Sequence, residues 1–258
     1  MNARSFFFSI PFAALLVSLV LPSCTTTKES PSSASSSSGS TSGQPPPAPT
    51  VSTVDGGSDP KTGVVRYLAL GDSLTQGVGA PNPDTGSYPA LLSEKWRARG
   101  CKVELQNHGI ASYKSADVIA DELPDVGTFK PTLVTLQVGA NDVANGISID
   151  AYRANVKTIL GTSKASGARV IVMPQNEWFR SPQGETYGPG LSEKRDAFDA
   201  VLIEETKAAG AEFVDLRLLF KQHADQKLWI DDGLHPTPAA YEAWASELAR
   251  VIPSPCGK

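Results

Sequence analysis

The stretch VVRYLALGDSLTQG (residues 64–77) starts as an apolar run and ends in a turn-forming segment that carries Ser73. An apolar run with little alternation is typical of a strand covered on both faces. Gly71, Asp72 and Ser73 follow the run directly. A serine after a strand commonly forms a turn or caps a helix, and it is a nucleophile only where other groups activate it. The rest of the chain decides between these interpretations.

Strand-like and helix-like segments alternate after this stretch. Further strands are predicted over residues 101–107, 132–138, 168–173 and 211–216, and helices over residues 88–98, 149–160, 191–210 and 238–252. Ser148 and Thr237 stand where N-caps are expected. Because right-handed crossovers join such elements, the pattern predicts the α/β class, with a five-stranded parallel sheet between two helical layers.

Ligands of such a sheet bind beyond the carboxyl ends of the strands, so the residues directly after each run matter most. These are Ser73 after the first run, Gly109 and Ile110 after the second, Asn141 after the third, residues 174–180 after the fourth, and the later segment WIDDGLHP (residues 229–236). All of them are expected at one rim of the sheet.

Four blocks at this rim, GDSLTQG, NHGI, GAND and DGLHP, resemble in order and spacing those of the SGNH (GDSL) hydrolases. The resemblance implies a flavodoxin-like three-layer sandwich and a nucleophilic serine at Ser73. It also implies an acid–histidine pair at Asp232 and His235, and oxyanion donors at Ser73, Gly109 and Asn141.

The chemistry of these residues fits the resemblance. A serine hydroxyl needs a neighbouring base near neutral pH, and His235 is the candidate because it lies on the same rim. His223 lies in a polar segment and is the weaker choice. Asp232, three residues before His235, can accept the other imidazole N–H. Asp231 is its rival, and we expect it to be a solvated loop acid.

A negative oxygen formed during acyl transfer needs donors that are already in place. Gly109 can bring its backbone N–H close to a substrate, Asn141 can offer its amide, and the Ser73 N–H would be the third donor. Taken alone, Gly109 could be a turn glycine with positive φ and Asn141 a cap residue. Asp72 and Asp142 are expected to be structural.

The walls of a substrate pocket are expected at the same rim, with Leu74, Ile110, Asn176 and Trp178 as candidates. His108 is expected to be a satisfied polar residue of the rim. The predicted protein is a serine hydrolase of carboxylic esters, similar to esterases and lysophospholipases. The alternatives are an acyltransferase, an esterase of O-acetylated sugars, and a catalytically silent module that binds glycan or lipid.

No cofactor is expected. One histidine with two adjacent acids is too small a donor set for a metal site, and the glycines of GDSLTQGVGA lack the lysine of a phosphate-binding loop. The net charge of −4, without a basic cluster, argues against nucleic acid as a partner. A monomer acting on a small ester or lipid is expected.

The first residues have the features of an export signal. Residues 1–23 hold a short basic start and an apolar run, and the segment ending at Cys24 resembles the lipobox of bacterial lipoproteins. Residues 24–62 are rich in Ser, Thr and Pro and are expected to be a disordered tether. Residues 63–258 form the predicted domain. The protein is therefore expected to be exported and lipid-anchored in a bacterial cell envelope.

Two cysteines remain after Cys24, namely Cys101 and Cys256. An exported chain meets an oxidising compartment, where the two could pair. They could equally be a buried thiol and a thiol of the C-terminal tail, because the sequence does not give the Cα separation that a bridge requires.

Overall fold

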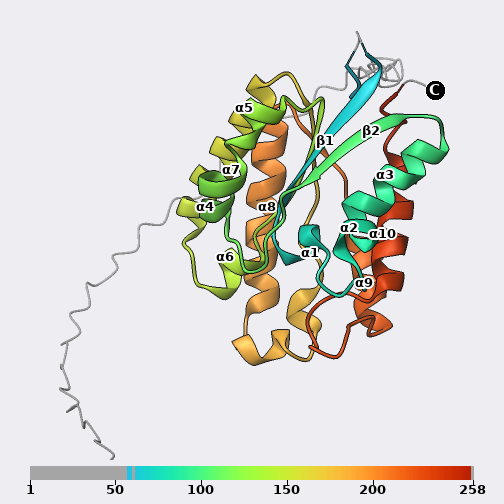
Figure 1. The fold of residues 1–258 in the computed structure, drawn as a ribbon. Helices are drawn as coiled ribbons and strands as arrows, with labels where there is room; N and C mark the ends of the chain where they lie inside the picture. Colours follow the sequence, from blue (N-terminus) through green and yellow to red (C-terminus); the bar gives the residue numbers. More distant parts are fainter. Residues whose placement is uncertain (1–56, 60–61, 257–258) are drawn as a thin grey trace, which may run out of the picture. The chain divides into compact units, whose positions relative to one another are not determined.

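A computed structural model of the chain describes residues 57–59 and 62–256 (Figure 1). The predicted signal, Cys24 and nearly all of the predicted tether lie outside the described residues. No helix in the described ranges is long and apolar enough to cross a membrane.

The centre of the fold is a five-stranded sheet in the order β2-β1-β3-β4-β5, and every neighbouring pair is parallel. The strands are β1 (Val64–Gly71), β2 (Lys102–Asn107), β3 (Leu133–Gln137), β4 (Arg169–Val172) and β5 (Glu212–Phe213). This order is that of flavodoxin-like sheets, so the predicted fold class is confirmed. In this topology the order reverses beside β1, the strand that leads to Ser73.

Helices cover both faces of the sheet (Figure 1). The longer ones are α3 (Tyr88–Ala98), α7 (Ile149–Ala165), α8 (Leu191–Ala208), α9 (Arg217–Asp225) and α10 (Pro238–Val251). The shorter ones are α1 (Ser73–Gln76), α2 (Pro83–Gly86), α4 (Ser115–Asp117), α5 (Asp125–Phe129), α6 (Ala140–Ala144), the π-helix η1 (Val118–Glu122) and the 3-10 helices η2 (Trp178–Arg180) and η3 (Gly184–Tyr187).

Two apolar cores lie on opposite faces of the sheet, because successive side chains of a strand point to opposite sides. Leu68 and Leu70 of β1 pack in the core that contains residues of α7 and α8. Tyr67 and Ala69 pack in the core that contains residues of α3, α9 and α10. The five residues from Tyr67 to Gly71 are all buried, as the apolar run at the start of the domain predicts.

The four predicted helices are present as α3, α7, α8 and α10. Ser148 and Thr237 act as N-caps, since their hydroxyls accept the N–H groups of Ala151 and Ala240 at 3.3 Å. The sequence missed α9, whose residues were read as a polar segment. Phe220, His223 and Ala224 of this helix are buried, and its other polar side chains are exposed.

The fifth strand is shorter than predicted and ends at Phe213. Asp215 then accepts the N–H of Arg217 at 3.1 Å, which begins the turn into α9. A carboxylate that binds the backbone two residues on favours a turn over an extended strand.

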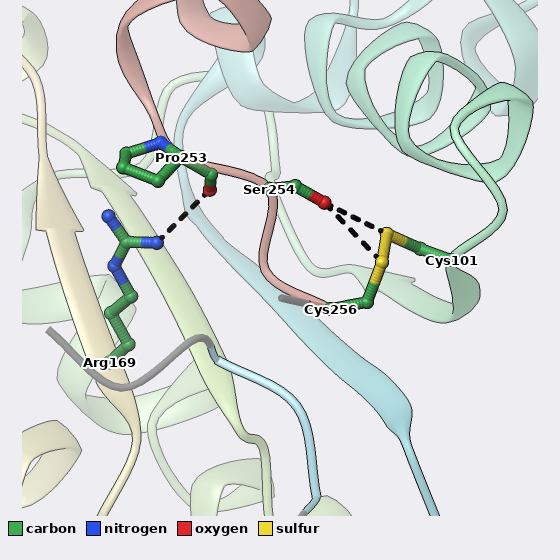
Figure 2. The surroundings of a disulfide bond; sticks show 5 residues. All are labelled: Cys101, Arg169, Pro253, Ser254 and Cys256. Carbon is green, nitrogen blue, oxygen red and sulfur yellow. Dashed lines mark hydrogen bonds between the residues drawn. A yellow bond between two sulfur atoms is a disulfide. The ribbon is translucent and has the colours of Figure 1, made fainter. Parts of the chain in front are cut away.

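A disulfide joins Cys101 to Cys256, with 5.5 Å between the Cα atoms and 155 residues of separation along the chain (Figure 2). Cys101 directly precedes β2, so the bond ties the segment after α10 to the start of that strand. The Ser254 hydroxyl lies 3.3 Å from each sulfur, and Arg169 holds the carbonyl of Pro253 at 3.4 Å. The alternative of two separate thiols is not what the structure contains.

Candidate active site

Ser73 stands at the first position of α1, directly after the carboxyl end of β1. Asp72 is the N-cap, and its Oδ1 accepts the Leu74 N–H at 2.9 Å. Because Ser73 opens the helix, its own N–H has no partner within the helix. Gly77, with φ of 94°, ends α1 after one turn. The serine is thus held on a tight strand-to-helix turn.

His235 and Asp232 continue from Ser73 in a chain of hydrogen bonds. The imidazole Nε2 lies 2.9 Å from Ser73 Oγ, and Nδ1 lies 2.5 Å from Asp232 Oδ2. Asp232 Oδ1 also accepts the N–H groups of Leu234 and His235, at 2.9 and 3.0 Å. Partial burial raises the pKa of Asp232, but the hydrogen bonds from His235 outweigh it and hold that pKa below its usual value. The carboxylate is therefore ionised at neutral pH.

The loop that carries this pair is closed on itself. Trp229 and Pro236 form an isolated antiparallel bridge, and the Ile230 N–H donates to the His235 carbonyl at 2.9 Å. Gly233 provides the positive φ of 67° that the turn between them requires. The rival acid, Asp231, is exposed and lines a different groove.

Gly109 is required by close packing rather than by its backbone angles. A Cβ at this position would lie 2.3 Å from the Gln76 N atom of α1. The φ angle of Gly109 is not positive, so its backbone conformation does not require glycine. The Gly109 N–H donates to Asn107 Oδ1 at 3.2 Å, in a turn of the kind that asparagine favours. The predicted donor is thus engaged with a neighbour in this structure.

Asn107 was not assigned a role from the sequence, although it connects the two segments. Its Nδ2 donates to the Thr75 carbonyl in α1 at 2.8 Å and to Ser87 Oγ at 3.3 Å. Asn107 therefore fixes the Gly109 turn against the helix that carries Ser73. Its place at the start of the NHGI block, at the carboxyl end of β2, is the signal that the sequence offers for it.

Asn141 lies in α6 and lines the same pocket as Ser73. Its Nδ2 donates to the Tyr113 carbonyl at 3.0 Å. A side-chain amide has two N–H donors, so one remains for another acceptor. Ser73 and Asn141 are therefore brought together, and the Gly109 turn packs against α1 beside them.

A pocket opens beside Ser73 and encloses about 390 Å³, including its solvent-open part. Three predicted wall residues line it, namely Leu74, Asn176 and Trp178. Ile110 does not line it and is 40% exposed, because the turn after β2 directs it to solvent. The sequence missed the remaining wall residues, Ala140, Ala144, Tyr187 and Leu234.

Three buried carboxyl groups surround the turn before Ser73. Burial raises the pKa of Asp72 to about 7 and that of Glu122 to about 9. Burial also raises the pKa of Asp142, which accepts the N–H and hydroxyl of Ser115 at 2.9 and 2.6 Å. Asp72 and Asp142 bind backbone, as expected, while Glu122 was not singled out.

Among the described residues, neither of the two other histidines forms a hydrogen bond with Ser73. His108 Nδ1 lies 3.2 Å from Asp125 Oδ2 and its Nε2 3.3 Å from Gln106 Oε1, so it is a satisfied rim residue as predicted. His223 is buried in α9, contrary to its interpretation as part of a polar segment, and burial lowers its pKa. Among the described residues, no three His, Cys, Asp or Glu side chains gather to hold a metal ion.

Comparison with known proteins identifies the family. The model of the GDSL-like lipase/acylhydrolase family matches residues 69–243. An arylesterase of Vibrio mimicus is 32% identical over 186 residues, covering 71% of this chain and 85% of that protein. The esterase TesA of Pseudomonas aeruginosa is 26% identical over 174 residues, covering 67% of this chain and 80% of that protein.

Solved structures share the fold. The crystal structure of TesA has a TM-score of 0.60 at 24% identity and covers 71% of this chain and 95% of its own. A lipase/acylhydrolase of Enterococcus faecalis has a TM-score of 0.61 at 20% identity, covering 72% and 94%. On the match over most of its domain and on its named relatives, the chain belongs to the GDSL-like lipase/acylhydrolase family and is a carboxylic ester hydrolase.

Proposed function

We propose that the enzyme cleaves carboxylic esters through a Ser-His-Asp triad of Ser73, His235 and Asp232 and a covalent acyl-enzyme. The observation that carries the proposal is the unbroken chain from Ser73 Oγ to His235 Nε2 at 2.9 Å and from Nδ1 to Asp232 Oδ2 at 2.5 Å. A hydroxyl, an imidazole and an ionised carboxylate in this order can activate the hydroxyl as a nucleophile.

In the first half of the reaction, His235 takes the proton from Ser73 while Oγ bonds to the substrate carbonyl carbon. Asp232 accepts the Nδ1 N–H and stabilises the imidazolium that forms. The tetrahedral intermediate then collapses. The carbon–oxygen bond to the alcohol breaks, and the alcohol leaves with the proton from His235. The acyl group stays on Ser73.

In the second half, water takes the place of the alcohol. His235 takes a proton from the water, whose oxygen bonds to the acyl carbon, and the carboxylic acid leaves as Ser73 regains its proton. The negative oxygen of both intermediates is held by the Ser73 N–H and the second N–H of the Asn141 amide. The Gly109 N–H joins them when the substrate oxygen replaces Asn107 Oδ1 as its acceptor.

The pocket favours substrates with a small apolar group next to the carbonyl. Leu74, Ala140, Ala144 and Leu234 supply apolar wall, and Trp178 with Tyr187 supplies aromatic wall. Burial of apolar groups against such walls is the main source of affinity in small pockets. Short acyl esters and aryl esters suit this pocket. An acetylated sugar would present the same acetyl group, and acyl transfer to a sugar would share the acyl-enzyme.

A fluorophosphonate probe tests the proposal, because it bonds only to a serine that a base has activated. The folded protein should be labelled on Ser73, and Ser73→Ala and heat-unfolded protein should not. Absence of label on folded protein would end the proposal. Release of p-nitrophenol from its acetate, with and without a sugar acceptor, separates hydrolysis from transfer.

We also propose that the chain is exported and lipid-anchored at Cys24. The disulfide between Cys101 and Cys256 supports export, because such bonds persist in oxidising compartments. Cells fed radiolabelled palmitate should incorporate label into the protein, and Cys24→Ala should abolish it. Label that survives this substitution would contradict the anchor.

A further inference from the structure

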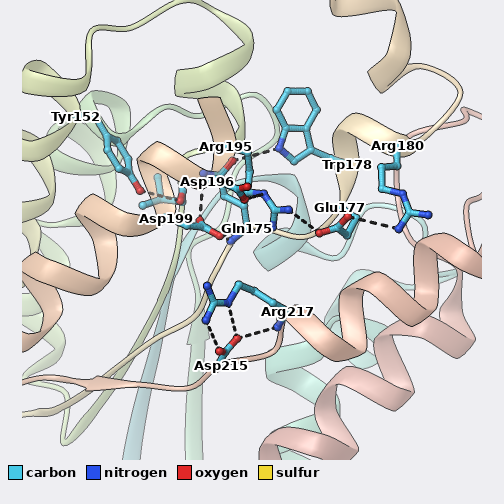
Figure 3. A network of polar contacts seen from close by, with 11 residues as sticks. Tyr152, Gln175, Glu177, Trp178, Arg180, Arg195, Asp196, Asp199, Asp215 and Arg217 are labelled. Atoms are coloured by element: carbon cyan, nitrogen blue, oxygen red, sulfur yellow. Dashed lines mark hydrogen bonds and ion pairs between the residues drawn. The ribbon is translucent and has the colours of Figure 1, made fainter. Parts of the chain in front are cut away.

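The segment after β4 forms the aromatic wall of the pocket, and a buried polar network holds it. Trp178 Nε1 donates to Gln175 Oε1 at 3.2 Å. Gln175 in turn donates to Asp199 Oδ1 of α8, through its backbone N–H at 3.2 Å and its Nε2 at 3.4 Å. Figure 3 shows this chain of hydrogen bonds from Asp199 of α8 to the indole of Trp178. Gln175 is fully buried, and Asp199 is 2% exposed.

The amide of Gln175 uses both of its functions at once. Its oxygen accepts from Trp178 and its nitrogen donates to Asp199. An amide can accept at one atom and donate at the other, whereas an ionised carboxylate has no donor. The contacts therefore fix the orientation of the amide, and the amide fixes the indole.

Gln175 also packs against the segment that carries Asn141. A Cβ on Gly139, the N-cap of α6, would lie 2.9 Å from Gln175 Nε2 and 2.8 Å from the Tyr152 hydroxyl. The Tyr152 hydroxyl donates to the Val138 carbonyl at 3.2 Å. Gln175 thus holds Trp178 and, together with Tyr152, also packs against the segment that carries Asn141.

A second set of contacts holds the backbone around Trp178. Arg195 of α8 donates to Glu177 Oε1 at 2.7 Å, and its guanidinium lies 4.8 Å from the centre of the Phe179 ring. Glu177 also lies 3.5 Å from Arg180. The backbone on both sides of Trp178 is therefore fixed, and the bond with Gln175 orients an indole that is also packed in the core.

The side chain of Trp178 is the element of this network that lines the pocket. It packs edge-on against Tyr187, with ring centres 6.0 Å apart, and Tyr187 lines the pocket as well. Rotation of the indole would displace Tyr187 and change the width of the space next to Ser73. The network thus connects a buried helix residue to the shape of the pocket.

We propose that Gln175 and Asp199 are positioning residues that hold the Trp178 indole and thereby set the size of the substrate group that the pocket accepts. The inference rests on the proposed function, because the pocket matters only if Ser73 acts on an ester. Neither residue lines the pocket itself. Both act through Trp178.

The test compares two substrates, p-nitrophenyl acetate and p-nitrophenyl octanoate, in wild type and Gln175→Met. Methionine keeps the volume of the side chain but makes neither of its two hydrogen bonds, to Trp178 and to Asp199. The ratio of the two kcat/KM values should change about tenfold through the KM of the octanoate, the scale of a misfit in an apolar pocket. The kcat for acetate should stay within a factor of about three. Asp199→Ala should behave like Gln175→Met, and Asp199→Asn, which keeps an acceptor oxygen, should restore the wild-type ratio.

A fluorescence measurement reports on the indole without any reaction. The contribution of Trp178 is obtained by subtracting the spectrum of Trp178→Phe from that of the parent protein. It should be shielded from acrylamide in wild type and quenchable in Gln175→Met. Asp196→Asn is the matched control, because Asp196 lies on the same helix and contacts Arg195 from solvent without reaching Gln175. It should change neither measurement.

Two outcomes would overturn the proposal. One is a wild-type substrate ratio with a shielded Trp178 in Gln175→Met. The other is an equal loss on both esters with a lower unfolding temperature, which is the effect of a purely structural role. If Gln175→Met fails to fold, Asp199→Ala decides through the ratio and the quenching, because it removes the acceptor of the Gln175 amide and leaves every pocket-lining side chain in place. A missing fluorophosphonate label on wild type would instead refute the hydrolase mechanism, while the quenching result would still decide what holds Trp178.

Discussion

Glu122 Oε2 accepts the backbone N–H of Gly71 at 2.8 Å, two residues before Ser73. The carboxyl is 1% exposed, and its Oε1 has no hydrogen-bond partner among the described residues. Its pKa is raised to about 9, mainly by burial and in part by the charge of Asp72, against the lowering effect of the Gly71 hydrogen bond. Glu122 is therefore a neutral acid near neutral pH, under the turn that holds the proposed nucleophile, Ser73.

Replacing Glu122 by Gln should change how stability depends on pH. The wild-type group has a pKa of about 9 in the folded protein and about 4.5 when exposed, so the folded state keeps a proton that the unfolded state releases. Its contribution to stability is complete below pH 4.5 and is lost as pH rises toward 9. Glutamine does not titrate. Glu122→Gln should gain stability over wild type steadily between pH 5 and 9 in urea unfolding.

Buried acids that do not interact with Glu122, such as Asp199, titrate alike in both proteins and cancel in this difference. Glu94→Gln serves as the control because its side chain is 67% exposed. Parallel stability curves for wild type and Glu122→Gln would show that the glutamate is ionised in the fold.

Removing a member of the proposed triad should abolish turnover without unfolding the protein. Ser73→Ala and His235→Ala should each lower kcat by a factor of about 10⁶, and Asp232→Asn by about 10⁴. The double variant of Ser73 and His235 should be no slower than either single one, because the two act as a unit. Unfolding free energies should change by less than about 1 kcal/mol. Additive losses in the double variant would contradict a shared mechanism.

A methyl group at Gly109 should disturb the nucleophile through the backbone. It would lie 2.3 Å from the Gln76 N atom, so α1 and the turn after β2 must move apart. A displacement of about 1 Å at a reacting group can cost about 100-fold in rate, and Gly109→Ala should lose that much kcat/KM and label more slowly with fluorophosphonate. Gly161→Ala is the control, because nothing lies within 4 Å of its added carbon. It should keep full activity and gain up to about 1 kcal/mol. Equal kcat/KM values for Gly109→Ala and Gly161→Ala would contradict this prediction.

Loss of the disulfide should weaken the fold and spare catalysis. The bond closes a loop of 155 residues, and native disulfides of this kind contribute about 2–5 kcal/mol. Cys101→Ser/Cys256→Ser should lose stability in that range in urea, and wild type in dithiothreitol should match it. The kcat/KM of the folded variant should be unchanged. Ser254→Ala, which leaves the bond intact, is the control, and a parallel loss of activity would contradict this separation.

The sheet and the position of the proposed catalytic groups could be predicted because the relevant signals are local. Long apolar runs mark β1 and β3, the block that holds Ser73 stands directly at the end of β1, and the block that holds His235 directly precedes α10. The short β5 and helix α9 were harder. Asp215 ends the strand by a local hydrogen bond, and the apolar face of α9 is only one or two residues wide.

The contacts between distant segments could not be predicted. Glu122 ends the stretch SADVIADE (residues 115–122), which contains no recognisable motif. Only the fold brings Glu122 to Gly71. The partnership of Gln175 with Asp199 joins a loop to a helix that starts sixteen residues later, without any spacing rule. Ile110 was placed in the pocket because it follows Gly109, but the turn there points it away.

The disulfide and the hydroxyl of Ser73 stand at opposite ends of β1. Val64 is in register with Lys102, the neighbour of Cys101, whereas Ser73 follows Gly71 at the other end. At about 3.3 Å per residue, the strand separates these ends by roughly 23 Å. A membrane that holds the chain just before Val64 would lie next to the disulfide. The pocket beside Ser73, at the other end of β1, would then be open to esters in solution.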